Sequence, residues 1–127
     1  MRTDIAEILE VAADLYESEQ IEWCRATFFN GPPGEEDTGD LFSACAWGAI
    51  VLAATESSEE AFAITGPPAE WYSPERELAW TAVEAAKRAV EVKLSWGLPY
   101  FNDYYARSKQ EIINLFKETA KDLRNQS

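Results

Sequence analysis

Histidine is absent from the 127 residues of this chain. Because histidine is the commonest general base, the commonest metal ligand and the usual sensor of pH near neutrality, its absence disfavours all three kinds of site. Cysteine is scarce as well: only Cys24 and Cys45 occur, each among apolar residues and outside any paired motif. We therefore expect two reduced core thiols and no disulfide framework. A thiol nucleophile would need a base or a nearby cation, and along the chain only Arg25 offers one.

Long apolar runs are also missing. No stretch approaches 18 consecutive apolar residues, and residues 1–10 lack a basic segment followed by an apolar one. The sequence thus predicts a soluble, cytoplasmic protein with no membrane-spanning segment. Glycine-rich phosphate loops, metal-binding clusters of cysteine and basic aromatic surfaces are absent too, so we expect no cofactor, no metal and no direct contact with nucleic acid.

Negative charge is what the chain has in excess. Its 23 Asp and Glu residues outnumber 11 Lys and Arg residues, so the formal net charge is −12. The excess belongs to the first part of the chain: residues 1–70 hold 15 acids and two arginines, whereas residues 71–127 hold eight acids and nine bases. Such a field attracts cations and basic surfaces and repels phosphate.

The apolar pattern predicts an all-α fold: a single domain over residues 1–127, built as a compact bundle of four main helices plus one short helix. A chain of this length can bury a sufficient core without metals or disulfides. Apolar residues repeat at helical spacing from Ile5 to Tyr16, after Asp4 as the capping residue. Residues 41–55 are apolar nearly all round, which is typical of a helix buried at the centre of a domain.

Capping residues locate two further helices. Ser57 precedes the expected short helix over residues 61–65, which Gly-Pro-Pro then stops. Pro74 at a first helical position opens the longest helix, and we expect this helix to end at Gly97.

A turn over residues 98–107 is expected to lead into the last helix. Ser108 and Glu111 have the spacing of a capping box at its start. Lys121 and Arg124 lie near its carboxyl end, where cations complement the helix dipole. The residues that repeat at helical spacing and should face the core are Ile112, Leu115, Phe116, Thr119 and Leu123.

Two segments between the first two helical regions are not helical by pattern alone. Residues 21–29 alternate too loosely to separate a helix from an extended strip. Residues 30–40 combine turn formers with four acids and no core side chain, so they predict an exposed acidic loop. Asp40 should cap the helix that follows.

Three short motifs spread over most of the chain carry a family resemblance. They are Trp23-Cys24 after the first helix, Cys45 to Ile50 in the central helix, and Phe101-Asn102-Asp103 before the last helix. In these motifs the chain resembles a family of small uncharacterised domains of actinobacteria and their phages. Because that family has no assigned reaction, the resemblance implies a fold and a genomic setting rather than an activity.

Asn102 and Asp103 are the polar pair from which a pocket is most readily built, because they lie between aromatic residues and could approach Trp23 or Trp47. The alternative is structural: Asn and Asp side chains at turns commonly bond their own backbone, and Asp103 could accept the amides that follow it. We consider the structural role the stronger of the two.

A row of like charges is the candidate working surface. Glu7, Glu10, Asp14 and Glu17 step by three, four and three residues and so lie on one ridge of the first helix, opposite its apolar stripe. Like charges at this spacing repel by up to about 0.5 kcal/mol a pair, so local stability does not explain the acidic ridge. We expect it to bind a basic protein surface, such as that of a host DNA-binding or regulatory protein, together with the carboxylates of Glu22, Glu35, Glu36, Asp37 and Asp40.

Three alternatives to general protein binding stay open. The chain could be a DNA mimic that inhibits a DNA-binding protein, although its ridge advances about 5 Å per charge whereas phosphates recur every 3.4 Å per strand. It could be an undetected enzyme or small-ligand binder with a pocket near Asn102 and Asp103. Its acids could also serve solubility alone.

Overall fold

The computed structural model describes residues 2–24, 29–30, 43–57, 61, 74–95 and 97–126. Most of the described residues are helical, as the sequence predicted. The elements in chain order are α1 (Ile5–Glu17), β1 (Glu22–Trp23), β2 (Phe29–Asn30), β3 (Ser43–Ala44), α2 (Ala46–Thr55), α4 (Pro74–Leu94), α5 (Leu98–Tyr100), the π-helical turn η2 (Phe101–Tyr105) and α6 (Lys109–Asn125).

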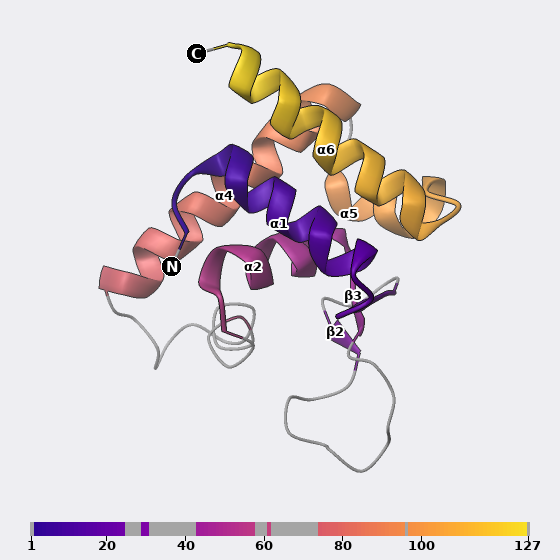
Figure 1. The fold of residues 1–127 in the computed structure, drawn as a ribbon, viewed down its shortest axis with the longest axis horizontal. Coiled ribbons are helices and arrows are strands. Elements are labelled where there is room, and N and C mark those ends of the chain that lie inside the picture. Colours follow the sequence, from indigo (N-terminus) through magenta and orange to yellow (C-terminus); the bar gives the residue numbers. More distant parts are fainter. Residues whose placement is uncertain are drawn as a thin grey trace.

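Helix α1 lies at the centre of the bundle, with α6 on one side and α2 on the other (Figure 1). It also contacts α4, which packs against both α2 and α6. One continuous apolar core joins these four helices. Its largest fully buried members are Tyr16, Phe116, Ile8, Leu9, Ile50, Leu98, Ile112, Ile113, Val51, Val83 and Val90.

The start of α1 follows the predicted capping arrangement. The Asp4 Oδ1 accepts a hydrogen bond of 3.1 Å from the Glu7 backbone N–H, which would otherwise lack a partner in the first helical turn. Ile8, Leu9 and Tyr16 are fully buried, so the predicted apolar stripe does face the core.

Helix α2 begins later than expected, and the predicted start at Leu41 is wrong. Ser43 and Ala44 form a strand, and Cys45 is the capping residue, with its Sγ accepting a hydrogen bond of 3.4 Å from Gly48 N–H. Residues 43–44 pair with β1 on one side and with β2 on the other, and this strand pairing competes with helix formation there. Asp40, the predicted cap, lies outside the described residues. The expectation of a helix buried nearly all round is confirmed for α2.

A small three-stranded sheet with the order β1-β3-β2 corrects the expectation of an all-α fold. Strand β1 runs parallel to β3 with Trp23 opposite Ala44, and β2 runs antiparallel to β3 with Phe29 opposite Ala44. Within residues 21–29, the extended alternative therefore holds at Glu22–Trp23 and at Phe29. Strands of two residues have no alternating pattern that a sequence could display.

Helix α4 begins at Pro74 as predicted but ends before the expected Gly97. Its last residue is Leu94, and Ser95 then adopts a left-handed conformation with φ of 60° while its N–H donates to the Glu91 carbonyl oxygen at 2.8 Å. Gly97 has φ of −68° and instead precedes α5. The stop is thus made by a serine in the conformation that glycine usually supplies.

The segment expected as a turn, residues 98–107, is largely helical: α5 continues directly into η2. In η2 the Ala106 N–H donates to the Phe101 carbonyl oxygen at 2.8 Å, a hydrogen bond five residues long that is typical of a π-helical turn. Helix α6 then begins, with Ile112 and Phe116 fully buried as predicted.

The predicted capping box of Ser108 and Glu111 does not form at the start of α6. The Glu111 Oε2 accepts a 2.6 Å hydrogen bond from the backbone N–H of Arg107 rather than of Ser108, and the Ser108 side chain makes no capping hydrogen bond. Of the predicted short helix over residues 61–65, only Ala61 is described, and it is helical and buried. Most of the predicted acidic loop over residues 30–40 lies outside the described residues.

Candidate functional site

Asn102 connects three distant parts of the chain from the interior of η2. Its fully buried side chain accepts two hydrogen bonds at Oδ1, from Trp23 Nε1 at 2.6 Å and from the Ala46 N–H at 2.9 Å. Its Nδ2 donates two, to the Cys24 carbonyl oxygen at 3.1 Å and to Asp103 Oδ1 at 3.0 Å. A carboxamide offers two donors and two acceptor positions, so the hydrogen-bonding capacity of Asn102 is fully used.

The Asn102 carboxamide takes the place of a missing ladder bond. The Cys24 N–H donates to the Ala44 carbonyl oxygen at 3.3 Å, continuing the parallel pairing of β1 with β3. The next bond of a parallel ladder would join the Ala46 N–H to the Cys24 carbonyl oxygen. Both groups instead bind Asn102, which therefore ends the sheet and satisfies an amide in the first turn of α2.

The two thiols lie beside this centre, and neither Cys24 nor Cys45 forms a disulfide bond. Burial, then the neighbouring Cys45 and Asp103, raise the pKa of the Cys24 thiol to about 11. Burial also raises the pKa of Cys45, against the lowering effect of hydrogen bonds from backbone amides including Gly48. Both thiols are therefore protonated near neutral pH, and a protonated thiol is a poor nucleophile.

Tyr16 of α1 also binds the backbone near the Asn102 group. Its hydroxyl donates a 2.7 Å hydrogen bond to the Ala44 carbonyl oxygen, and burial, with the nearby Cys45 and Cys24, raises its pKa well above the ordinary range. The hydroxyl thus acts as a buried neutral donor that ties α1 to β3. Among the residues that the structure describes, no group of three or more Cys, Asp and Glu side chains is placed to hold a metal ion.

The structure brings together three of the four residues expected to line a pocket. Trp23, Asn102 and Asp103 form one hydrogen-bonded group. Trp47 follows Ala46 in α2, but its ring packs on α4: it lies 6.1 Å from the Trp80 ring, and Lys87 Nζ sits 3.9 Å from its centroid. The Asn102 group is built as a structural joint, but its hydrogen bonds run to the distant Trp23, Cys24 and Ala46 and not to the local backbone that the structural interpretation named.

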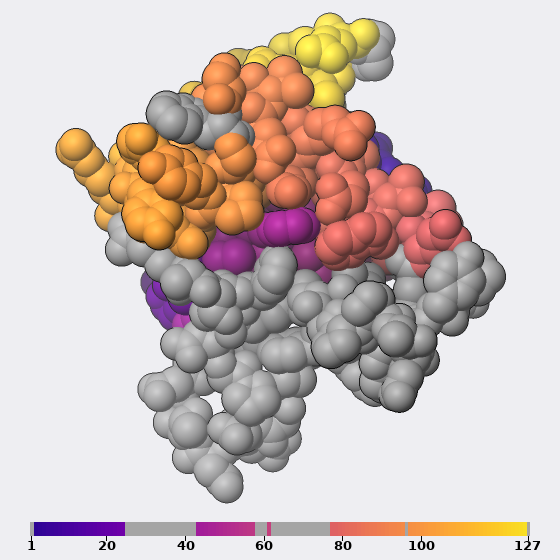
Figure 2. Space-filling model, turned by 180° about the vertical axis from the view of Figure 1, so that it is seen from behind, coloured from indigo at the N-terminus to yellow at the C-terminus, as the bar shows by residue number. Residues whose placement is uncertain are grey.

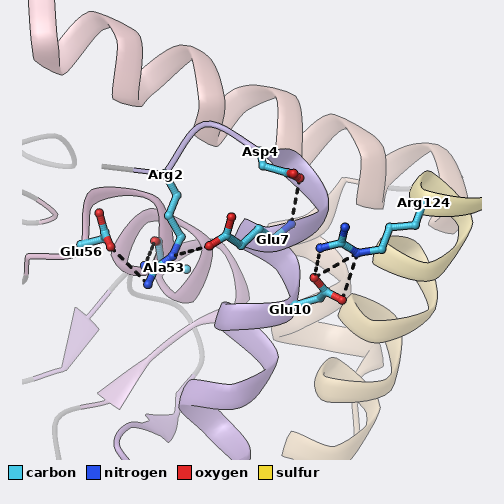
Figure 3. A network of polar contacts seen from close by, with 7 residues as sticks. All are labelled: Arg2, Asp4, Glu7, Glu10, Ala53, Glu56 and Arg124. Carbon is cyan, nitrogen blue, oxygen red and sulfur yellow. Dashed lines mark hydrogen bonds and ion pairs between the residues drawn. The ribbon is translucent and has the colours of Figure 1, made fainter. Parts of the chain in front are cut away.

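The acidic ridge faces cations of the same molecule. Arg124 of α6 binds both carboxylate oxygens of Glu10, with its Nε 3.2 Å from each (Figure 3). Lys117 of α6 pairs with Glu17. Because α1 and α6 run antiparallel, the order of the pairs along one helix is reversed along the other.

Arg2 neutralises a further member of the ridge. Its Nε lies 3.6 Å from Glu7 Oε1, while its other nitrogens contact the Ala53 carbonyl oxygen at 2.7 Å and Glu56 Oε1 at 3.2 Å (Figure 3). Arg2 thus also holds the carboxyl end of α2, where a cation is favourable. Asp14 is the one ridge carboxylate with no ion pair among the described residues.

The remaining predicted partner-binding acids divide into two groups. Glu22 is half-buried in β1. The others lie outside the described residues and stay predictions; they are Glu35, Glu36, Asp37 and Asp40.

Sequence reasoning missed the basic ridge of α6. Lys117, Lys121 and Arg124 step by four and three residues, the same kind of spacing that revealed the acidic ridge of α1. With Glu10 they line a shallow groove of about 450 Å³ between the two helices. The matching spacing of the acids on α1 and the bases on α6 could have predicted these ion pairs. Nothing in the sequence predicts that Arg2 pairs with Glu7.

A family model matches residues 1–122. The chain belongs to DUF6197, a family of unknown function. The expected resemblance to an uncharacterised family is thereby confirmed, and membership of DUF6197 assigns no reaction. No curated protein and no solved structure matches the chain. In the described part of this DUF6197 protein, no helix is both long and apolar enough to cross a membrane.

Proposed function

We propose that this DUF6197 protein is a cytoplasmic binding protein of actinobacterial or phage origin that docks a basic surface of a protein partner, such as a DNA-binding or regulatory protein. Its surplus of carboxylates carries the proposal. The described residues include sixteen acids and ten bases, and the rest of the chain adds seven acids and one base. Internal ion pairs cannot neutralise this excess, so a negative field persists around the folded molecule.

Ion pairs within the protein change which acids we propose for the docking surface. Glu7, Glu10 and Glu17 are engaged by cations of the same chain, so they contribute less to the outward field than the sequence suggested. Among the described residues, no ion pair engages Asp14 in α1 or Glu19 just after it, and both side chains are exposed. We assign the docking role to these two together with Glu22 and the acids at positions 35–40.

The other candidate functions have weaker support. A DNA mimic needs a regular row of uncompensated charges, and α6 interrupts the row on α1. A reaction at the Asn102 centre would need an activated group, but Asn102 has no spare hydrogen-bonding position and both thiols have raised pKa values.

Affinity capture from the native cell, compared between charge variants, tests the proposal. The test variant is Asp14→Asn with Glu19→Gln, and the matched control is Glu84→Gln with Glu118→Gln, which changes the net charge equally on other helices. A third variant neutralises the four acids at positions 35–40. These isosteric changes leave the ion pairs between α1 and α6 intact.

A basic protein should be captured by the wild type and by the control, and its yield should fall in the test and third variants. Capture should also weaken steeply as salt rises from about 0.1 M to about 1 M, because the screening length falls from about 10 Å to about 3 Å. Equal capture by all four proteins, or capture that does not respond to salt, would refute the proposal.

A further inference from the structure

Three tyrosine rings form an exposed aromatic cluster on the outer side of α5 and η2. Tyr100, Tyr104 and Tyr105 are 50%, 74% and 47% exposed. The Tyr100 ring lies 4.9 Å from the Tyr104 ring and 5.4 Å from the Tyr105 ring, centroid to centroid. Single exposed apolar residues are ordinary, but three large rings in mutual contact form a patch. We call these three residues the tyrosine patch.

The π-helical turn builds this patch. In an α-helix the residue five positions on points away from the first, whereas the wider π-helical turn places the residues four and five positions on at either side of it. Tyr104 and Tyr105 accordingly both contact Tyr100. Asn102 points inward from the same turn and is held by its hydrogen bonds to Trp23, Cys24 and Ala46. The patch is therefore attached to the hydrogen-bonded Asn102 group.

The orange part of the chain, which includes α5 and η2, lies at the surface on the face that also carries α4 (Figure 2). Tyrosine is enriched at the centres of protein interfaces, because its ring gives a large contact area at low conformational cost. Each ring can remove about 150–250 Å² from water when a partner covers it. The patch thus has the composition of an interaction surface.

The field of the whole molecule, with its net charge of −12, selects among possible occupants of the patch, although the charges of residues 71–127 themselves nearly balance. A phosphate-bearing ligand is repelled, and so is a second copy of the same chain. A cationic partner is attracted, and aromatic faces bind cations directly. Arginine suits this patch better than lysine, since its planar, weakly hydrated guanidinium stacks on rings whereas an ammonium group remains hydrated.

We propose that the tyrosine patch binds arginine side chains of the basic protein partner. This inference rests on the proposed function, because the partner is the same. The general negative field brings a basic surface close regardless of its residue types, and the patch then distinguishes arginine from lysine through ring stacking.

Peptides of eight arginines and of eight lysines, titrated calorimetrically into the full chain, test the inference. The two peptides carry equal charge, so a difference in affinity reports the side chain rather than the field. We expect the arginine peptide to bind the wild type about fivefold more tightly, as expected when each stacked cation contributes about two- to fivefold.

Four proteins are compared in this titration. The triple alanine variant of Tyr100, Tyr104 and Tyr105 should bind both peptides equally, and the triple phenylalanine variant should keep the preference because it retains the rings. Leu78→Ala with Val92→Ala is the control, since these exposed α4 residues are also apolar and its preference should match the wild type. Circular dichroism verifies that each variant is folded.

The possible failures point to different conclusions. Equal binding of both peptides by the wild type overturns the arginine inference but leaves the proposed function standing. Binding of neither peptide overturns both. Sedimentation that shows a dimer in the wild type and a monomer in the triple alanine variant would assign the patch to a second copy and overturn the arginine inference.

Discussion

The indole Nε1 of Trp23 donates a 2.6 Å hydrogen bond to Oδ1 of Asn102, although 79 positions separate the two residues. This contact joins the small sheet to the π-helical turn, and the same carboxamide also binds the start of α2. One side chain thus orders three segments that have no local reason to adopt their positions. The three motifs that carry the family resemblance, at residues 23–24, 45–50 and 101–103, are joined by the hydrogen bonds of Asn102.

Asn102→Ala should destabilise the protein by about 1–3 kcal/mol or more, because it removes the buried acceptor of the Ala46 N–H and also the Asn102 hydrogen bonds to the partly buried Trp23 Nε1 and Cys24 carbonyl oxygen. Chemical denaturation measures the free energy of unfolding. Asn114→Ala is the control: this exposed asparagine only accepts from Gln110, so its loss should change stability by less than about 0.5 kcal/mol. Similar effects of the two substitutions would contradict the structural role.

Asn102→Asp should lose stability in a pH-dependent way. Burial, the neighbouring Asp103 and the Cys24 carbonyl oxygen should raise the pKa of the new carboxyl in the folded state by more than the hydrogen bonds from Trp23 and Ala46 lower it. A raised folded pKa means that stability is retained at low pH and lost as the pH rises through that value. Thermal unfolding from about pH 4 to about pH 8 should therefore show a falling melting temperature relative to wild type, and a flat difference would argue against the placement.

The pairing between Glu10 and Arg124 should be measurable but weak. Both side chains are about half exposed, so a double-mutant cycle with Glu10→Gln and Arg124→Gln should give a small favourable coupling that shrinks further in high salt. Asp14→Asn on the same ridge has no ion pair to lose and should be neutral or slightly stabilising, since it relieves repulsion from its neighbours. A coupling of zero would mean that Arg124 does not neutralise Glu10, and that Glu10 contributes to the negative field around the protein.

Two substitutions after α4 should have effects opposite to those expected from residue type. Ser95→Gly should stabilise by about 0.5–1 kcal/mol, because glycine adopts a φ of 60° without the strain that serine bears. Gly97→Ala should be neutral or slightly stabilising, since φ is −68° and an added Cβ meets no atom within 4 Å. Thermal unfolding measures both, and destabilisation by Gly97→Ala would mean that the helix stop does lie there.

Alkylation of Cys24 should be slow at neutral pH and should accelerate as the pH rises through about 11, the pKa to which burial, Cys45 and Asp103 raise it. At pH 8 we expect a rate about tenfold below that of an unperturbed thiol, because fewer thiolates form although each is a stronger nucleophile. Mass spectrometry of peptides cleaved after arginine separates Cys24 from Cys45, which lies on the other side of Arg25. Fast labelling at pH 7 would reopen a catalytic role for this thiol.

The helices α1, α4 and α6 could be predicted because their information is local. Asp4 caps residues only three positions away, and Pro74 begins α4 by its own backbone restriction. The end of α4 escaped prediction because the left-handed conformation was adopted by Ser95, a residue type that does not signal it. The sheet escaped because its two-residue strands are defined by their partners rather than by their own pattern.

The sequence by itself determined the helical class, the faces that are buried, the negative charge and the lack of histidine, since all of these follow from composition and short-range spacing. Only the tertiary structure decided what the polar residues do. It placed Arg124 beside Glu10, 114 positions away in the sequence, and it placed Asn102 within hydrogen-bonding distance of Trp23, Cys24 and Ala46. The physical reason is that hydrogen bonds and ion pairs act over a few ångströms, so their partners are chosen by how the helices pack and not by distance along the chain.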